Sequence, residues 1–127
     1  MNLNQVTVPS IDVAASVDFY IRLGLRQIVA SLPDYARFEC PDGGATFSIH
    51  RVDRISNGQG IIVYFECEEL DAAVDDLKRS GIVFESEPRD QSWLWREAYL
   101  RDPDGNMICL YHCRREPPLP ALAHLNN

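Results

Sequence analysis

One order of secondary structure elements occurs twice in this sequence, and this repeat limits the fold more than any other feature. Hydrophobic periods and turn residues predict a strand, a helix and three further strands in each half. Gly24 and Gly81, which both follow a helical pattern, lie 57 residues apart, and at the same offset Val74 corresponds to Val17. Each half is too small to cover a sheet face alone. We therefore predict an α+β domain: two βαβββ modules that form one cup-shaped mixed sheet with the helices on its outer face.

The expected elements are bounded by residues that start or stop helices and strands. In the first half, the helix lies between Asp12, a typical N-cap residue, and Gly24, and strands are expected at 3–8, 26–31, 35–39 and 45–50. In the second half, the helix lies between Glu69 and Gly81, and strands are expected at 61–67, 82–86, 94–101 and 107–112. Gly and Asn residues at 56–60 indicate a linker. A single domain, 1–113, thus holds module one (3–55) and module two (60–113), followed by an irregular, proline-rich C-terminal tail at 114–127.

Residues 102–105, with the sequence DPDG, predict a hairpin between the last two strands. The Asp102 side chain can accept a backbone hydrogen bond, Pro103 fixes φ at the second turn position, and Gly105 tolerates a positive φ. A weaker copy, CPDGG at 40–44, separates the corresponding strands of the first half. The two turns support the repeat.

Composition and charge exclude several classes of function. The 127 residues include 12 basic and 19 acidic side chains, a net charge of −7, whereas nucleic acids and anionic membranes attract basic surfaces. No apolar run approaches the roughly 20 residues of a membrane span, and the N-terminus has no signal-peptide pattern. The four cysteines form no CxxC pair, which favours free thiols in a reducing compartment. We expect a cytoplasmic protein with neither nucleic acid nor a membrane as its partner.

Three segments resemble motifs of one protein superfamily. Residues 19–25 (FYIRLGL) are similar to the motif FYxxLGL, residues 102–110 (DPDGNMICL) to DPDGNxIEL, and residues 65–71 (FECEELD) to FxVxDLD. These are motifs of the glyoxalase / bleomycin-resistance / extradiol-dioxygenase superfamily, also called the vicinal oxygen chelate fold. The resemblance covers residues 3–112 and implies the fold, but this fold hosts several chemistries. It also implies a homodimer whose cavities are built from two chains.

The resemblance implies where a metal ion would bind, because metal-using members take ligands from the first and last strands of each half. The corresponding positions are Gln5, Ser48 or His50, Ile62 and Cys109. Ile62 has no donor atom, Gln5 offers a neutral carbonyl, and a protonated serine is a poor ligand. We therefore expect no cofactor and no functional metal site. The open alternative is an atypical divalent-metal site of Gln5, His50 and Cys109.

Without a metal ion, the inner face of the cup is a candidate pocket for a small organic molecule. Strand alternation places aromatic, apolar and a few polar side chains there, and two tryptophans lie in or beside the segment by which the second half is longer. The predicted ligand-binding residues are Gln5, Thr7, Ser48, His50, Ile62, Tyr64, Trp93, Trp95, Tyr99, Cys109 and Tyr111. The alternative is plain packing for the aromatic residues and a surface position for His50.

Glu97 and His50 are the candidate catalytic residues. If Glu97 faces the cup among aromatic rings, desolvation disfavours its charged form and makes it a candidate general base. The alternative is a salt bridge to an arginine, namely Arg96, Arg101 or Arg37. Three functions remain: a metal-free binding protein resembling the bleomycin-resistance proteins, which we prefer; a glyoxalase-I-like, metal-dependent lyase or isomerase, or a dioxygenase-type enzyme; and a metal-free enzyme that transfers protons with Glu97 or His50.

Overall fold

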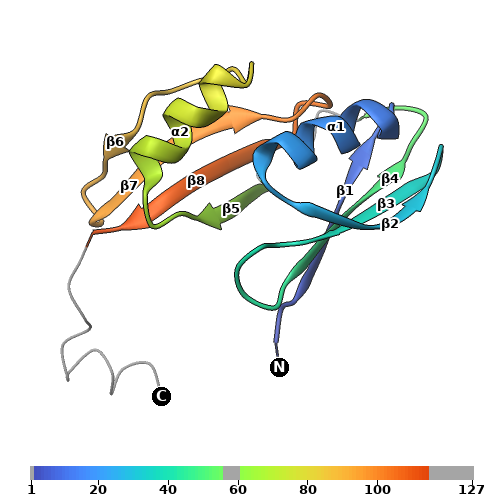
Figure 1. The fold of residues 1–127 in the computed structure, drawn as a ribbon, viewed down its shortest axis with the longest axis horizontal. Helices are drawn as coiled ribbons and strands as arrows, with labels where there is room; N and C mark the ends of the chain where they lie inside the picture. Colours follow the sequence, from blue (N-terminus) through green and yellow to red (C-terminus); the bar gives the residue numbers. More distant parts are fainter. Residues whose placement is uncertain (1, 56–60, 115–127) are drawn as a thin grey trace.

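The computed structural model describes residues 2–55 and 61–114, which form two modules side by side (Figure 1). The expected linker at 56–60 and the tail from 115 onward lie outside the described residues. The first module holds β1 (Gln5–Ser10), α1 (Val13–Leu23), β2 (Arg26–Ser31), β3 (Tyr35–Glu39) and β4 (Thr46–Arg51). The second holds β5 (Ile62–Glu66), α2 (Leu70–Arg79), β6 (Arg89–Asp90), β7 (Trp95–Arg101) and β8 (Met107–Cys113). The α+β class and the repeated βαβββ module are thereby confirmed.

Each module forms a four-stranded sheet of its own. The strand orders are β1-β4-β3-β2 and β5-β8-β7-β6. In each sheet the first strand of the module runs parallel to the last, and the other pairs are antiparallel. The prediction of one shared sheet differs from the structure here, since no strand of the first sheet pairs with a strand of the second in the described part of the chain.

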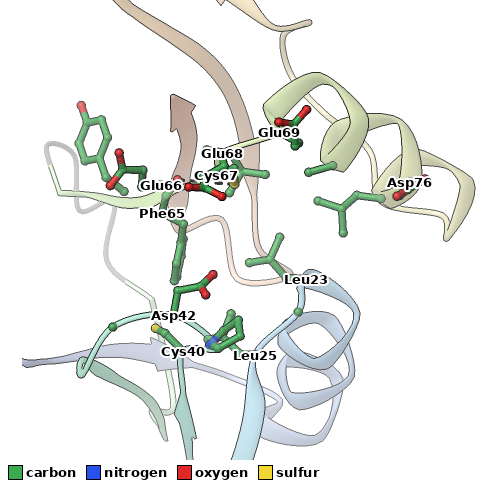
Figure 2. Close-up of a pocket in the computed structure, with 17 residues that line it drawn as sticks. Leu23, Leu25, Cys40, Asp42, Phe65, Glu66, Cys67, Glu68, Glu69 and Asp76 are labelled. Atoms are coloured by element: carbon green, nitrogen blue, oxygen red, sulfur yellow. Dashed lines mark hydrogen bonds between the residues drawn. The ribbon is translucent and has the colours of Figure 1, made fainter. Parts of the chain in front are cut away.

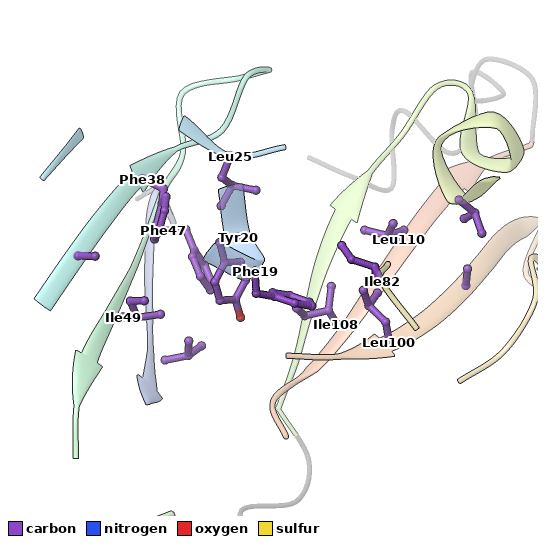
Figure 3. Packing of buried hydrophobic residues seen from close by; sticks show 14 of the residues in the cluster. Phe19, Tyr20, Leu25, Phe38, Phe47, Ile49, Ile82, Leu100, Ile108 and Leu110 are labelled. Carbon is purple, nitrogen blue, oxygen red and sulfur yellow. The ribbon is translucent and has the colours of Figure 1, made fainter. Parts of the chain in front are cut away.

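The hydrophobic core lies between the two sheets and explains why they stay separate. Figure 3 shows Phe19 and Tyr20 of α1 between the buried residues of the two sheets. The ring centroid of Tyr20 lies 4.6 Å from that of Phe47 in β4, which in turn lies 6.0 Å from that of Phe65 in β5. Each sheet turns its helix-covered face toward this common core. The other face of each sheet, which we call its open face, therefore points away from the core.

Two of the sequence motifs meet in space and tie the modules together. The hydroxyl group of Tyr20 in α1 donates a 2.6 Å hydrogen bond to Oδ2 of Asp102 in the turn between β7 and β8. The carboxylate of Asp104 accepts hydrogen bonds from the Ser16 hydroxyl at 2.8 Å and from the backbone N–H of Ile11 at 2.7 Å. The hairpin turn of module two thus holds the first strand and helix of module one in place.

The hairpin turn itself is built as the sequence predicts. Oδ1 of Asp102 accepts the backbone N–H groups of Asp104 at 3.0 Å and Asn106 at 2.8 Å. The N–H of Gly105 donates to the Asp102 carbonyl at 3.0 Å, and Gly105 has φ +85°. The conformation of this turn therefore depends on the Asp side chain and on a residue that can adopt a positive φ.

Both helices begin and end near the residues predicted from the sequence. The Asp12 side chain accepts the backbone N–H of Ala15 at 3.2 Å, and Gly24 closes α1 with φ +121°. In α2, Leu70 and Val74 are buried as the helical spacing predicts, whereas Glu69 makes no side-chain cap. No helix in the described part of the chain is long and apolar enough to cross a membrane.

Two strand predictions differ from the structure. The first strand continues through Pro9 to Ser10, because β1 is an edge strand and tolerates a residue without an N–H group. The expected strand at 82–86 is reduced to one bridge between Phe84 and Leu100, and the short β6 follows it. The backbone N–H groups of residues 85 and 86 both point at the carbonyl of Tyr99, so the ladder cannot continue there.

Candidate functional site

Three aromatic side chains form a corner on the open face of the second sheet. The rings of Trp95 in β7 and Tyr111 in β8 stack with centroids 4.1 Å apart and planes at 14°. Tyr64 of β5 stands nearly perpendicular to both, with centroid distances of 6.0 and 5.9 Å. The Tyr64 side chain keeps 45% of its surface exposed. The structure thus brings three predicted ligand-binding residues together, and we call them the aromatic corner.

Glu97 lies on the same face of β7 as Trp95, with only 2% of its surface exposed. Its Oε1 accepts a 2.8 Å hydrogen bond from the hydroxyl of Tyr99, and its Oε2 accepts one of 3.1 Å from the indole N–H of Trp93. Through these hydrogen bonds, Glu97 holds the side chains of Trp93 and Tyr99, two further predicted ligand-binding residues.

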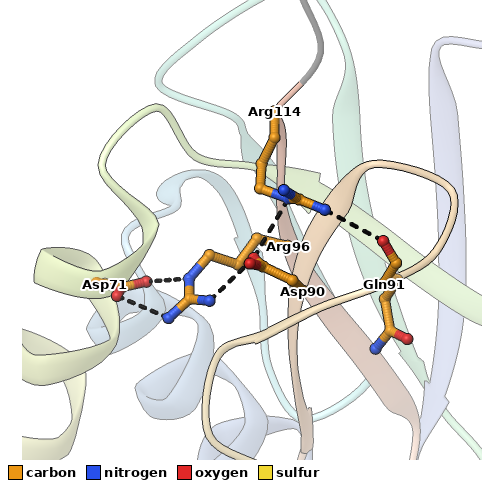
Figure 4. A network of polar contacts seen from close by, with 5 residues as sticks. All are labelled: Asp71, Asp90, Gln91, Arg96 and Arg114. Atoms are coloured by element: carbon orange, nitrogen blue, oxygen red, sulfur yellow. Dashed lines mark hydrogen bonds and ion pairs between the residues drawn. The ribbon is translucent and has the colours of Figure 1, made fainter.

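The salt-bridge alternative for Glu97 is not what the structure shows. Arg96 points to the helix side of the sheet, where it binds both carboxylate oxygens of Asp71 at 2.8 and 3.0 Å and Asp90 at 3.0 Å (Figure 4). The hydrogen bonds from Arg96 lower the pKa of Asp71. Arg101 pairs with Glu85, and the third candidate, on β3, belongs to the first sheet. Within the described residues, Glu97 is thus held by neutral donors only.

Cys109 is fully buried beneath this face, opposite Tyr64 and Tyr99 in the sheet register. Burial raises the pKa of its thiol to about 12, and the charge of Glu97 acts in the same direction. At neutral pH the side chain is therefore a protonated thiol. Such a group is neither the thiolate nucleophile nor the thiolate metal ligand that cysteine chemistry requires.

On the open face of the first sheet, polar side chains are connected to one another by hydrogen bonds in a continuous chain. Gln5 of β1 donates from Nε2 to the hydroxyl of Ser48 at 2.7 Å, and Ser48 shares a second 2.7 Å hydrogen bond with the Thr7 hydroxyl. The Thr46 hydroxyl donates to Oε1 of Gln5. Arg37 of β3 completes the chain, because its Nη2 donates to the Thr46 hydroxyl at 3.1 Å.

Arg37 is a residue of this face that the sequence prediction omitted. Its Nε–H is buried without a hydrogen-bond partner in the described part of the chain. The sequence contains the pattern that indicates this position, because strand alternation places Arg37 on the same face as Ser48, its partner in the sheet register.

The remaining predicted residues do not join either group. His50 is exposed at the end of β4, opposite Tyr35 and Pro9 in the register, and Ile62 is exposed at the start of β5. Because His50 lies on the first sheet and Glu97 on the second, the two candidate catalytic residues are not brought together within one chain.

The positions implied for a metal ion do not fit one. The polar side-chain atoms of Gln5 and Ser48 already form hydrogen bonds with each other and with neighbouring hydroxyl groups. Cys109 is a protonated thiol, and Ile62 has no donor atom. They also belong to two different sheets. Across the described residues, no group of three or more His, Cys, Asp or Glu side chains could hold a metal ion.

A cleft between the modules was not expected from the sequence. It has a volume of about 890 Å³ and lies between the end of α1, the turn at 40–44, β5 and α2 (Figure 2). Its apolar lining includes Leu23, Leu25 and Phe65, and its acidic lining consists of Asp42, Glu66, Glu68, Glu69 and Asp76. Burial, followed by the charge of Asp42, raises the pKa values of the Cys40 and Cys67 thiols. Of the predicted ligand-binding residues, only Tyr64 borders the cleft.

Comparisons with known proteins agree with the fold. A protein-family model described as the Glyoxalase/Bleomycin resistance protein/Dioxygenase superfamily matches residues 2–110. A glyoxalase/bleomycin resistance protein/dioxygenase from Nocardioides superimposes with a TM-score of 0.75 at 26% identity, over 94% of this chain and 87% of that chain. Lactoylglutathione lyase from Agrobacterium tumefaciens superimposes with a TM-score of 0.74 at 17% identity, over 89% and 94%, which shows the fold alone. The uncharacterized protein YraH of Bacillus subtilis (strain 168) is 39% identical over 51 residues, 39% of this chain and 40% of that protein.

Proposed function

Because the chain belongs to the glyoxalase/bleomycin resistance protein/dioxygenase superfamily, we propose that it binds a small organic molecule without the help of a metal ion. The proposed site is the open face of the second sheet. One observation carries the proposal: Tyr64, Trp95 and Tyr111 form a partly exposed aromatic corner beside the buried carboxylate of Glu97. Apolar walls with a few fixed polar groups are the usual composition of a small-molecule site.

In this proposal the protein is a homodimer, and the open face of the first sheet of one chain covers the aromatic corner of the other. Within one chain the two open faces point away from each other, so they cannot enclose a cavity by themselves. Ile62 and Tyr64 also expose apolar surface that a second chain would bury.

Tryptophan fluorescence tests the proposed site directly, because both tryptophans of the chain belong to it. A ligand at the aromatic corner should change the emission and raise the melting temperature, since it binds only the folded state. Tyr64→Ala should weaken both responses, whereas Ile28→Ala on β2, a similarly exposed position, should leave them unchanged. The proposal fails if no compound from a diverse aromatic library alters either signal in the wild-type protein.

The metal-dependent alternative is tested by elemental analysis of protein purified without chelators. We expect no stoichiometric zinc, nickel, manganese or iron, because Gln5, Ser48 and Cys109 offer no free anionic donor. One equivalent of such an ion per chain, lost in the Gln5→Ala variant, would replace the proposed function by a glyoxalase-type activity.

A metal-free enzyme is the second candidate function, and the burial of Glu97 at the aromatic corner is the observation that favours it. Proton transfer by a positioned side chain contributes about 10²–10⁴-fold to a rate. Glu97→Gln should therefore lower the turnover of any compound that the protein converts by at least about 100-fold. The exposed Glu85→Gln variant is the matched control. Full turnover in Glu97→Gln would remove this candidate.

A further inference from the structure

The polar side chains on the open face of the first sheet have a defined hydrogen-bond direction. A guanidinium group only donates, so the Thr46 hydroxyl must accept from Arg37 and turn its own proton to Gln5. Gln5 then donates from its amide group to the hydroxyl of Ser48. The side-chain oxygens of Thr46, Gln5 and Ser48 therefore each accept a hydrogen bond from within the protein.

The groups left over on this face are donors. Arg37 has five N–H donors. One of them, on Nη2, donates to the Thr46 hydroxyl, and the Nε–H has no hydrogen-bond partner among the described residues. In the described residues no carboxylate forms an ion pair with Arg37, and Glu39, two positions along the same strand, pairs instead with Arg26 at 3.1 Å. The face thus presents an uncompensated positive charge next to a hydroxyl chain.

We propose that Arg37 binds a carboxylate group of the ligand, so that the protein selects aromatic carboxylic acids. This inference rests on the proposed function, because the aromatic part of the same molecule would lie against the aromatic corner of the partner chain. A planar guanidinium pairs two N–H groups with a carboxylate, and turning toward the ligand gives the orphaned Nε–H an acceptor.

Three probes that share one ring system separate the contribution of charge from that of the ring. They are 2-naphthoate, the neutral 2-naphthamide and the cationic 2-naphthylmethylammonium, titrated into the full-length protein by calorimetry. We expect 2-naphthoate to bind at least about tenfold more tightly than the amide, as a charge-assisted pair provides. In Arg37→Gln the two affinities should become equal, whereas Arg22→Gln, which removes an exposed charge from α1, should keep the difference.

The outcomes distinguish this inference from the proposed function. Equal affinity of the wild type for naphthoate and naphthamide, or a preference for the cation, would overturn the role of Arg37 while leaving a ligand site at the aromatic corner. Binding of none of the three probes would count against both proposals.

A second variant tests whether Arg37 serves the ligand or the fold. Arg37→Met keeps the apolar stem of the side chain and removes its unpaired donors. It should lose the preference for naphthoate while its melting temperature without ligand stays equal or rises. A lower melting temperature, or dissociation of a wild-type dimer into monomers in this variant, would overturn the inference, since Arg37 would then pair with a protein group.

Discussion

Tyr20 joins ring packing and a hydrogen bond across the modules in one side chain. It is fully buried, contacts the rings of Phe38 and Phe47, and donates its proton to Asp102 at 2.6 Å. Burial, with a further contribution from the charge of Asp102, raises the pKa of Tyr20 far above its ordinary value. The hydroxyl group therefore remains a hydrogen-bond donor even at an alkaline pH at which an ordinary tyrosine loses its proton.

Removing this hydroxyl group should destabilise the protein without creating a large cavity. Tyr20→Phe leaves the buried Asp102 carboxylate with one donor fewer, which should cost about 1–3 kcal/mol in the free energy of unfolding, measured in urea. Tyr35→Phe is the matched control, because its hydroxyl makes no hydrogen bond among the described residues. Equal stability of the Tyr20→Phe variant and the wild type would contradict the role given to this contact.

Cys109 should make the protein sensitive to alkali. Its pKa is raised by burial to about 12 in the folded protein, against about 8.5 in an unfolded chain. The unfolded state therefore loses a proton first as pH rises. The stabilisation is complete below about pH 8.5 and is lost progressively between there and about pH 12. The urea midpoint of the wild type should therefore fall as pH rises through this range. Cys109→Ala should make this fall smaller, whereas Cys113→Ala should not. An equally steep fall in Cys109→Ala would contradict the role given to Cys109.

At the scale of elements, the turn between β7 and β8 depends on one backbone conformation. Gly105 has φ +85°, and a Cβ atom there would meet no other atom within 4 Å, so a substitution tests the backbone alone. Gly105→Ala should cost about 1–2 kcal/mol. Gly44→Ala is a close control, since that position also has open space but no positive φ. Equal unfolding free energies for the two variants would contradict this account.

The sequence predicted those elements whose ends depend on local chemistry. Asp12, Gly24 and the turn beginning at Asp102 were found because a cap or a turn needs only neighbouring residues. The extension of β1 through Pro9 was missed, since it depends on β1 lying at a sheet edge. The segment 82–86 alternates like a strand, yet its backbone turns away at Tyr99. Edge position and ladder partners are properties of the assembled sheet.

At the scale of the molecule, the two modules share one core and should unfold together. Both tryptophans belong to the second module, whereas Tyr20 belongs to the first. Tyr20→Phe should therefore shift the tryptophan-fluorescence midpoint as far as the midpoint seen by far-UV circular dichroism. Two separate transitions, with the fluorescence midpoint unchanged, would show that the modules fold independently.

The site was predictable within each sheet but not between sheets. Strand alternation correctly grouped Tyr64, Trp95 and Tyr111 on one face. It could not show that Gln5 and Cys109 would lie on separate sheets, because that separation depends on the packing of α1 between the sheets. The cleft between the modules was missed for the same reason, since its two walls meet only through tertiary packing.

The acidic lining of that cleft makes the stability of the protein depend on ionic strength. Asp42 projects from one module, and Glu66, Glu68, Glu69 and Asp76 from the other, and none of the described residues that line the cleft is basic. Because like charges on the two walls repel each other, the packed arrangement of the modules should be less stable in dilute buffer. At 0.15 M salt the screening length falls to about 8 Å, and the repulsion weakens. Melting temperatures should therefore climb as sodium chloride is added, and Asp42→Asn should reduce that climb.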